Sequence, residues 1–345
     1  MKVKVGIIGA TGYAGIELVR LLLAHPMVSL TCISSISYMG KPLSEVYPAM
    51  SELYDVILSD EEQVVESCDV VFASLPHGLS EDIAKKCYEK NRLFIDLGAD
   101  FRLADEEDYK AWYGNNYTQK QLHTKAVYSI PELNRDELKD VVLIANPGCY
   151  PTSAALALVP ALQAELVDLS SIIIDSKSGV SGAGRGLNLS THYPECNEAF
   201  APYKIASHRH TPEIEQTLSR YAKEKVTITF VPHLLPVNRG ILTTAYANLK
   251  KQIDHKEIIR YYKDFYMKDK FVRIMNKDEI SNIKYVRYSN YCNISLHKDN
   301  RTNRLIIISA IDNMVKGAAG QAIQNMNIAL KIPEDAGLCY IAPSI

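Results

Sequence analysis

One cysteine lies where an apolar run meets a segment of helical composition. Residues 146–149 read Asn-Pro-Gly-Cys, after the apolar residues 141–145 and before the alanine-rich residues 153–158. At a strand-to-helix junction, unpaired backbone N–H groups and the positive end of the helix dipole favour thiolate over thiol. The position makes Cys149 a candidate nucleophile for covalent acyl transfer. A cysteine is as often a small buried apolar residue, so its position alone leaves both interpretations open.

A second polar segment offers proton donors and acceptors. His208 and His210 flank an arginine, and Glu213 follows in the same segment. In an extended backbone the two histidines would point to the same face. Thr211 is expected to be the N-cap of a helix, with Pro212 at its first position. A carboxylate beside an imidazole commonly orients it, which is the role expected of Glu213.

A glycine-rich turn follows the first predicted strand, over residues 3–8. Gly9 suits a tight turn, Gly12 would let the backbone approach a pyrophosphate, and Gly15 would let helix and strand pack closely. A pyrophosphate would then lie on the helix N-terminus. The turn therefore predicts a dinucleotide site, with these candidate residues: Gly9, Thr11, Gly12, Tyr13, Ala14 and Gly15.

The end of the second predicted strand, over residues 28–33, discriminates between cofactors. NAD sites usually place an acidic residue there for the ribose hydroxyls. This chain instead offers Ser35, Ser37 and, shortly after, Lys41. Hydroxyls and a lysine suit a 2′-phosphate, so the sequence favours NADPH or NADP as the cofactor.

Strands alternate with helices through about residue 145, and strands dominate afterwards. The first pattern is typical of a Rossmann-type doubly wound parallel sheet, and the second of an α+β domain with a mostly antiparallel sheet. We expect an α/β protein with a dinucleotide-binding domain over residues 1–148, completed by residues 313–345. A catalytic and dimerisation domain would span residues 149–312. Within it, residues 285–288 alternate like a strand, and residues 179–202 read as a long functional loop.

Composition narrows the class of protein. The 345 residues include 38 basic and 40 acidic side chains, for a net charge of −2, which gives no support for nucleic-acid binding. The seven cysteines are odd in number and none is spaced as C-x-x-C, which argues against a disulfide framework or a zinc ribbon. No metal site, signal peptide or membrane span is expected, and a cytoplasmic location is the default.

Six motifs together resemble those of the N-acetyl-gamma-glutamyl-phosphate reductases, the arginine-pathway branch of the aspartate-semialdehyde dehydrogenase-like group. The resemblance spans nearly the whole chain, and the cysteine motif is highly specific. Met314 stands where leucine is common. The matching segments are residues 9–15, 74–78, 146–152, 178–185, 208–213 and 311–319.

The resemblance implies NADPH-dependent reduction of an acyl phosphate through a cysteine thioester. Cys149 would be the nucleophile and His210 its acid–base partner, held by Glu213, with His208 the second candidate. Arg102 would hold a substrate carboxylate, or else form a structural ion pair with Asp96 or Asp100. The other residues implied in cofactor or substrate binding are Pro76, Ser181, Gly182, Arg185, Arg209 and Asn313.

Other functions stay open from the residues alone. A sister reductase acting on a carrier-bound acyl phosphate would favour a basic docking face, which the near-neutral charge does not indicate. Aspartate-semialdehyde dehydrogenase activity is disfavoured by the Pro-Gly before Cys149 and by the His-Arg-His motif. A non-catalytic nucleotide sensor would not need the cysteine and histidine together. The acyl group, acetyl or succinyl, is not defined, and a homodimer or homotetramer is expected.

Overall fold

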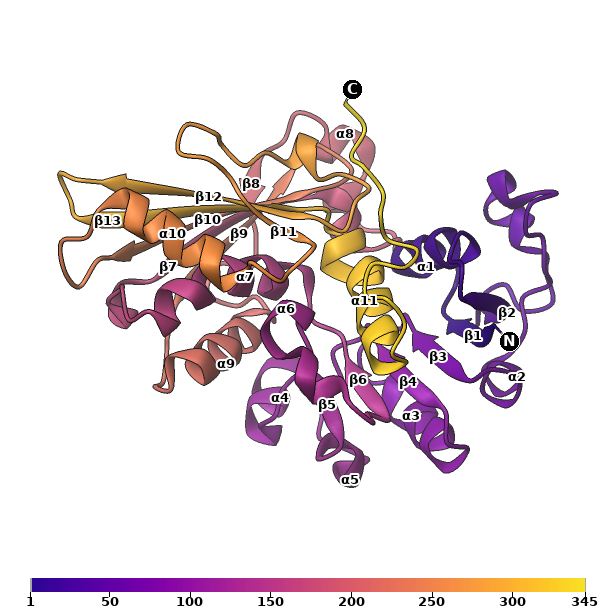
Figure 1. The fold of residues 1–345 in the computed structure, drawn as a ribbon. Helices are drawn as coiled ribbons and strands as arrows, with labels where there is room; N and C mark the ends of the chain where they lie inside the picture. Colours follow the sequence, from indigo (N-terminus) through magenta and orange to yellow (C-terminus); the bar gives the residue numbers. More distant parts are fainter. Residues whose placement is uncertain (1, 345) are drawn as a thin grey trace. The chain divides into compact units, whose positions relative to one another are not determined.

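The computed structural model describes residues 2–344, which form two compact units (Figure 1). The first unit comprises Met1–Pro147 and Ala318–Cys339, so it draws on both ends of the chain. The second comprises Gly148–Gly317 and Tyr340–Ile345. Among residues 2–344, none of the helices combines the length and the apolar character that a bilayer crossing requires.

The first unit is built on a six-stranded sheet in the order β2-β1-β3-β4-β6-β5, and every pairing is parallel. This arrangement confirms the predicted Rossmann-type fold. The strand order reverses between β1 and β3, the point at which ligands bind in open α/β sheets. The strands are β1 (Val3–Ile8), β2 (Val28–Ser34), β3 (Val70–Ala73), β4 (Leu93–Asp96), β5 (Ala126–Tyr128) and β6 (Leu143–Ala145).

Helices connect these strands and cover the sheet. The last helix, α11, returns to this unit, where Asn327 Oδ1 lies 3.0 Å from His25 Nε2. The helices are α1 (Tyr13–Leu23), α2 (Glu61–Ser67), α3 (Ser80–Glu89), α4 (Glu106–Tyr113), α5 (Lys120–His123), α6 (Pro131–Asn134) and α11 (Gly320–Ala329).

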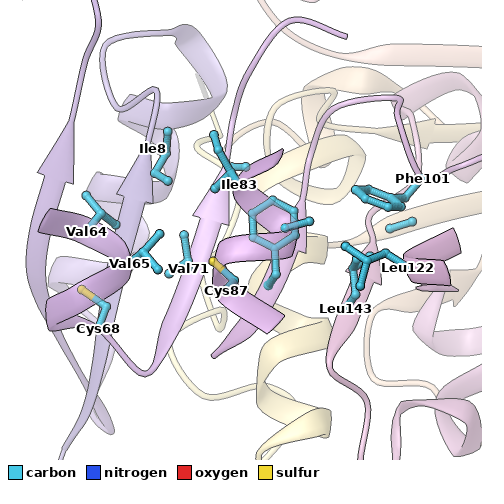
Figure 2. Close-up of a cluster of buried hydrophobic side chains, with 14 residues drawn as sticks. Ile8, Val64, Val65, Cys68, Val71, Ile83, Cys87, Phe101, Leu122 and Leu143 are labelled. Atoms are coloured by element: carbon cyan, nitrogen blue, oxygen red, sulfur yellow. The ribbon is translucent and has the colours of Figure 1, made fainter. Parts of the chain in front are cut away.

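A buried apolar cluster joins the sheet to α2, α3 and α5 (Figure 2). Val64 and Cys68 on α2 pack so closely on β1 that a Cβ at Gly6 would lie 2.5 Å from Val64 Cγ1. Asp60 starts α2 by accepting the Gln63 backbone N–H. Each fully buried Val, Ile or Phe stabilises the unit by about 1.5–3 kcal/mol. The cluster includes Ile8 and therefore helps to hold the carboxyl end of β1, which the glycine turn follows.

The second unit contains a seven-stranded sheet in the order β11-β12-β13-β10-β7-β9-β8. Two pairings, β7 with β9 and β11 with β12, are parallel, and the other four are antiparallel. The prediction of a mostly antiparallel sheet is confirmed. The strands are β7 (Ile173–Gly179), β8 (Ala201–Pro202), β9 (Thr229–Leu235), β10 (Ile241–Asn248), β11 (Val272–Ile274), β12 (Cys292–Asp299) and β13 (Arg304–Ile311).

The predicted strand over residues 285–288 is wrong. The chain forms a short 3-10 helix there, Ile283–Tyr285, and Tyr288 has a positive φ of 61°. The Tyr288 backbone N–H donates to Asp312 Oδ2 at 2.6 Å. The Tyr288 backbone N–H is therefore bonded to a side-chain carboxylate rather than to the carbonyl of a neighbouring strand. The alternation of residue types did not indicate this bond.

Helix α7 (Cys149–Gln163) is buried on all sides, as expected of a helix that is apolar all round. Its Ser153 hydroxyl bonds to Thr243 on β10 and to Ser309 on β13, both at 2.9 Å. These buried hydroxyls fix the helix against the sheet one turn after Cys149. The other helices of the unit are α8 (Tyr193–Cys196), α9 (Thr211–Ala222) and α10 (His255–Phe265).

Candidate active site

Cys149 is the first residue of α7, and its side chain is partly exposed. Gly148 is the N-cap, in an extended conformation with φ −69° and ψ 160°. The first backbone N–H groups of a helix have no partner within it, and the helix dipole is positive at this end. This environment favours a thiolate at Cys149, as expected from the sequence.

Glu213 joins the start of α7 to His210. Its carboxylate is buried, with the side chain 1 % exposed, and Oε1 accepts the Gly148 backbone N–H at 2.7 Å. The other oxygen, Oε2, lies 3.9 Å from His210 Nε2. One buried carboxylate thus contacts the nucleophile's N-cap and faces the histidine, which brings three predicted site residues together.

His208 occupies a different environment. Its Nδ1 accepts the His210 backbone N–H at 3.1 Å, and its Nε2 lies 3.4 Å from Tyr203 Oη. Burial, then the charges of His210, Lys204 and Arg209, lower the pKa of His208 to about 2, so its imidazole is neutral.

The condition of an extended segment is not met, because residues 205–207 and 209–210 form turns. The rings of His208 and His210 lie 4.9 Å apart and are inclined at 64°. The helix also starts one residue earlier than predicted: His210 is the N-cap and Thr211 the first helical residue. The two histidines are neighbours through a turn rather than through strand alternation.

A turn of π-helix, Val315–Ala319, packs against Cys149. A Cβ placed on Gly317 would lie 2.7 Å from Cys149 Cβ, so only glycine allows this approach. Asp312 holds the turn, since its Oδ1 accepts the Met314 and Val315 backbone N–H groups at 2.8 and 3.0 Å. Gly317 lies in the matching segment 311–319, but the sequence did not indicate it as a site residue.

The predicted substrate loop is fixed by its own polar side chains. The Ser181 hydroxyl donates to the Asn238 carbonyl at 2.6 Å. Asn313 donates from Nδ2 to Ser181 Oγ at 2.9 Å and accepts the Gly240 N–H at 2.8 Å. Gly182 lies beside Asn313, with 3.6 Å between a Cβ built on Gly182 and Asn313 Nδ2.

The two arginines predicted to aid phosphate differ in exposure. Arg185 is exposed, in the segment that follows Ser181 and Gly182, and Arg209 is partly exposed, between the two histidines. The structure therefore places both guanidinium groups on segments that carry other predicted site residues.

In the first unit, the glycine turn has the close approaches that its spacing predicts. Gly9 has φ +82°, and a Cβ there would lie 2.4 Å from the Ser74 carbonyl oxygen. A Cβ on Gly15 would lie 2.2 Å from the Gly9 carbonyl oxygen. Gly12, the N-cap of α1, has only the Gly9 oxygen nearby, at 3.6 Å. The open space is therefore at Gly12, where a pyrophosphate would approach, and the turn fits a dinucleotide. Thr11, Tyr13 and Ala14 lie in the same turn.

The serines and lysine after β2 are not equivalent. Ser35 is buried, and its hydroxyl lies 2.7 Å from Thr11 Oγ1, which ties the end of β2 to the glycine turn. Ser37 is exposed. Lys41 forms an ion pair with Glu45 on the same loop. The Tyr47 hydroxyl, which sequence reasoning missed, donates to the Thr11 carbonyl at 2.9 Å.

Arg102 is buried at the carboxyl ends of two strands. Its Nε donates to the Asn146 carbonyl at 2.9 Å, and its Nη2 donates to the Leu97 carbonyl at 2.7 Å. These bonds hold the segments that follow β4 and β6. A role in binding a substrate carboxylate stays a prediction. Pro76, predicted to contact the cofactor, is exposed on the loop after β3.

Next to Arg102 lies a buried pair of carboxyl groups. Asp96 Oδ1 accepts the Ser80 hydroxyl and the Gly98 N–H, both at 2.8 Å. Burial, then the neighbouring Asp100, raises the pKa of Asp96 to about 7, so this group carries a proton over part of the neutral range.

Comparison with known proteins places both units in one family. Residues 4–141 match the family described as semialdehyde dehydrogenase, NAD binding domain, and residues 149–313 match semialdehyde dehydrogenase, dimerisation domain. The chain is 63% identical to an N-acetyl-gamma-glutamyl-phosphate reductase of Brachyspira hyodysenteriae, with 99% of each chain covered. A protein of the same name from Clostridium beijerinckii is 54% identical, again over 99% of each chain.

Solved structures show the same fold. Aspartate semialdehyde dehydrogenase II of Vibrio cholerae superposes with a TM-score of 0.75 at 17% identity, over 96% of this chain and 99% of that one. Aspartate semialdehyde dehydrogenase of Candida albicans, solved with NADP, gives a TM-score of 0.70 at 15% identity, over 98% and 99% of the two chains.

Proposed function

Because the chain belongs to the semialdehyde dehydrogenase family, in the group of the N-acetyl-gamma-glutamyl-phosphate reductases, we propose that it reduces N-acetyl-gamma-glutamyl phosphate. The products are N-acetylglutamate 5-semialdehyde and phosphate, and the reaction serves arginine biosynthesis. The observation that carries this proposal is the arrangement of Cys149, Glu213 and His210, in which one buried carboxylate serves both the nucleophile's helix and the histidine.

The first step is acyl transfer to the cysteine. The Cys149 thiolate attacks the acyl carbon, a carbon–sulfur bond forms, and the carbon–oxygen bond to phosphate breaks with both electrons on the phosphate. Backbone N–H groups at the start of α7 suit the oxyanion that develops on the acyl group. Arg185 and Arg209 are the cations assigned to the departing phosphate.

His210 manages the proton of the reaction. As an imidazolium it gives a proton to the leaving phosphate, and it takes one up from solvent before the next cycle, while Cys149 stays a thiolate. Glu213, 3.9 Å away, stabilises the imidazolium that exists between these transfers. After reduction, the thiohemiacetal oxyanion collapses, the carbon–sulfur bond breaks, and the Cys149 thiolate is regenerated beside the helix N-terminus.

The cofactor assigned to the glycine turn is NADPH, which when bound supplies the hydride that reduces the thioester. Gly12 would let the pyrophosphate approach the start of α1, and Gly9 and Gly15 would shape the turn that holds it. Ser37 and Lys41 are the residues assigned to the 2′-phosphate, and Lys41 would exchange Glu45 for the phosphate. Ser35 acts indirectly, since its hydroxyl contacts Thr11.

The setting follows from the same chemistry. A cysteine nucleophile needs reducing surroundings, which supports a cytoplasmic location. The match of residues 149–313 to a domain described as a dimerisation domain supports a homodimer or homotetramer. Sedimentation velocity on the purified chain tests that assembly.

The activity is tested in both directions with the purified chain. We expect NADP reduction by N-acetylglutamate semialdehyde only when phosphate is present, and NADPH oxidation by the acyl phosphate. Turnover of the acetylated substrate is compared with that of the succinylated substrate, each with NADPH and with NADH. The Lys41→Ala variant tests the contact with the 2′-phosphate. NADP reduction that does not require phosphate contradicts the proposal. So does a lack of turnover with both the acetylated and the succinylated substrate.

A further inference from the structure

A line of hydrogen-bonding groups runs from the histidine segment to β9. Tyr203 Oη lies 3.4 Å from His208 Nε2, and the Tyr203 hydroxyl donates to Tyr150 Oη at 3.1 Å. The Tyr150 hydroxyl in turn donates to the His233 carbonyl at 3.3 Å. Tyr150 lies in the 146–152 motif but was assigned no role there, and Tyr203 lies outside the matching segments.

The direction of every bond in this line is determined. His208 Nδ1 accepts the His210 backbone N–H, so it carries no proton. The imidazole is neutral, and its one proton is therefore on Nε2. Because the Tyr203 proton is directed to Tyr150, Tyr203 can only accept from His208. The order is His208 Nε2–H to Tyr203, then Tyr150, then the β9 carbonyl.

His208 therefore has no ring nitrogen left for substrate, which separates the roles of the two histidines. Its contact with the His210 backbone and its ring beside the His210 ring fix where that residue lies. Tyr150 directly follows Cys149, so the same line reaches the nucleophile's helix. Tyr203 itself is anchored by its backbone N–H, which donates to the Pro232 carbonyl at 3.0 Å.

We infer that Tyr203 is a positioning residue for the reaction: by accepting the His208 Nε2–H it fixes the orientation of the His208 ring, and through His208 it holds His210 for proton transfer. This inference rests on the proposed function for its kinetic consequence. Tyr203 directly follows β8, at the end of the 179–202 segment, and β8 pairs with β9. The pairing of that segment with β9 therefore influences the position of His210 through Tyr203 and His208.

The test combines nitrogen NMR of the histidines with kinetics. In the wild-type chain, labelled at histidine, His208 should be the Nε2–H tautomer at pH 7, with its signal assigned by loss in His208→Gln. In Tyr203→Phe, which keeps the ring, we expect the Nε2 signal of His208 to shift because its hydrogen-bond acceptor is lost, while Nδ1 stays unprotonated. We also expect kcat to fall on the order of tenfold to a hundredfold, with KM for NADPH unchanged and the pH profile of kcat displaced.

Tyr262→Phe is the matched control. Like Tyr203→Phe, this substitution removes a tyrosine hydroxyl that donates a hydrogen bond. The Tyr262 hydroxyl donates to the Ala157 carbonyl on α7 at 2.7 Å and contacts neither histidine. The substitution should lower thermal stability without changing the His208 signal or the pH profile. A wild-type His208 that is protonated on Nδ1, or a Tyr203→Phe variant with wild-type kcat and pH profile, overturns the inference. The NMR measurement needs no substrate, so it can test the role of Tyr203 even if the proposed function is wrong.

Discussion

The chemistry of the site depends first on which atom accepts the acyl group. Cys149→Ser keeps the shape of the site but replaces the thiolate with a hydroxyl that stays protonated at neutral pH. We expect NADPH binding, followed by fluorescence titration, to stay within about twofold, and kcat to fall by a factor on the order of 10³ or more. Cys196→Ser, at the end of α8, is the control and should keep the wild-type kcat. Substantial turnover by Cys149→Ser would exclude a thioester.

Glu213 is the residue whose single side chain contacts two parts of the site. In Glu213→Gln the side chain keeps its size and can still accept the Gly148 N–H, but it no longer carries the charge that faces His210. We expect kcat to fall on the order of tenfold to a hundredfold, with the pH limb that reports the histidine displaced towards lower pH, since the imidazolium loses its stabilising carboxylate.

Glu215→Gln on the same helix is the comparison for that variant. Glu215 Oε1 also accepts a backbone N–H, that of Ile228 at 2.9 Å, so the two substitutions change the same kind of bond. Equal kinetic effects of the two would show that Glu213 acts on the stability of α9 alone.

At the scale of elements, two strand-to-helix junctions follow from local sequence patterns and were predicted. The β1–α1 turn depends on local spacing, and Gly9 and Gly15 make the close contacts expected. The junction of β6 and α7 is local in the same way, and Cys149 lies at the helix start.

Contacts between distant segments were not accessible to that reasoning. Gly317 approaches Cys149 through a π-helical turn, which local periodicity does not distinguish from an α-helix. Likewise, the Tyr203–His208 contact depends on how residues 203–210 turn, which the sequence did not indicate. Side-chain partners set by tertiary packing explain both omissions.

The π-helical turn gives a prediction of its own. In Gly317→Ala the added Cβ would meet Cys149 Cβ at 2.7 Å and Cα at 3.2 Å, and α7 cannot move because it is buried on all sides. The turn or the cysteine must shift, so we expect kcat to fall at least about tenfold. The rate of Cys149 alkylation should change as well, as measured by mass spectrometry. Gly186→Ala, where a Cβ meets nothing within 4 Å, should behave as the wild type.

At the scale of the whole chain, the boundaries between the two units fall in segments that adjoin Cys149. The division falls between Pro147 and Gly148 and again between Gly317 and Ala318. Gly148 caps the helix of Cys149, and Gly317 packs on Cys149 itself. The glycine turn and Cys149 therefore belong to different units, and the points at which the chain passes between the units include Gly148 and Gly317, which are next to Cys149.

Stability of the whole molecule should depend on pH through Asp96. Its pKa is about 7 in the folded chain, against an ordinary value of 3.8, so the folded state holds a proton that the unfolded state releases between these values. Below about pH 4 both states are protonated and the contribution is complete. It is lost as pH rises through 7, at up to about 1.4 kcal/mol per pH unit.

Asp96→Asn removes this titration but keeps the size of the side chain beside Asp100 and Arg102. We expect the difference in unfolding free energy between wild type and Asp96→Asn to shift in favour of the variant from pH 4.5 to pH 8, measured by urea denaturation. Asp136→Asn, at a carboxylate that is 88 % exposed, should give no such trend. Parallel curves for wild type and Asp96→Asn would mean that Asp96 stays ionised in the folded chain, with Arg102 rather than a proton balancing its charge.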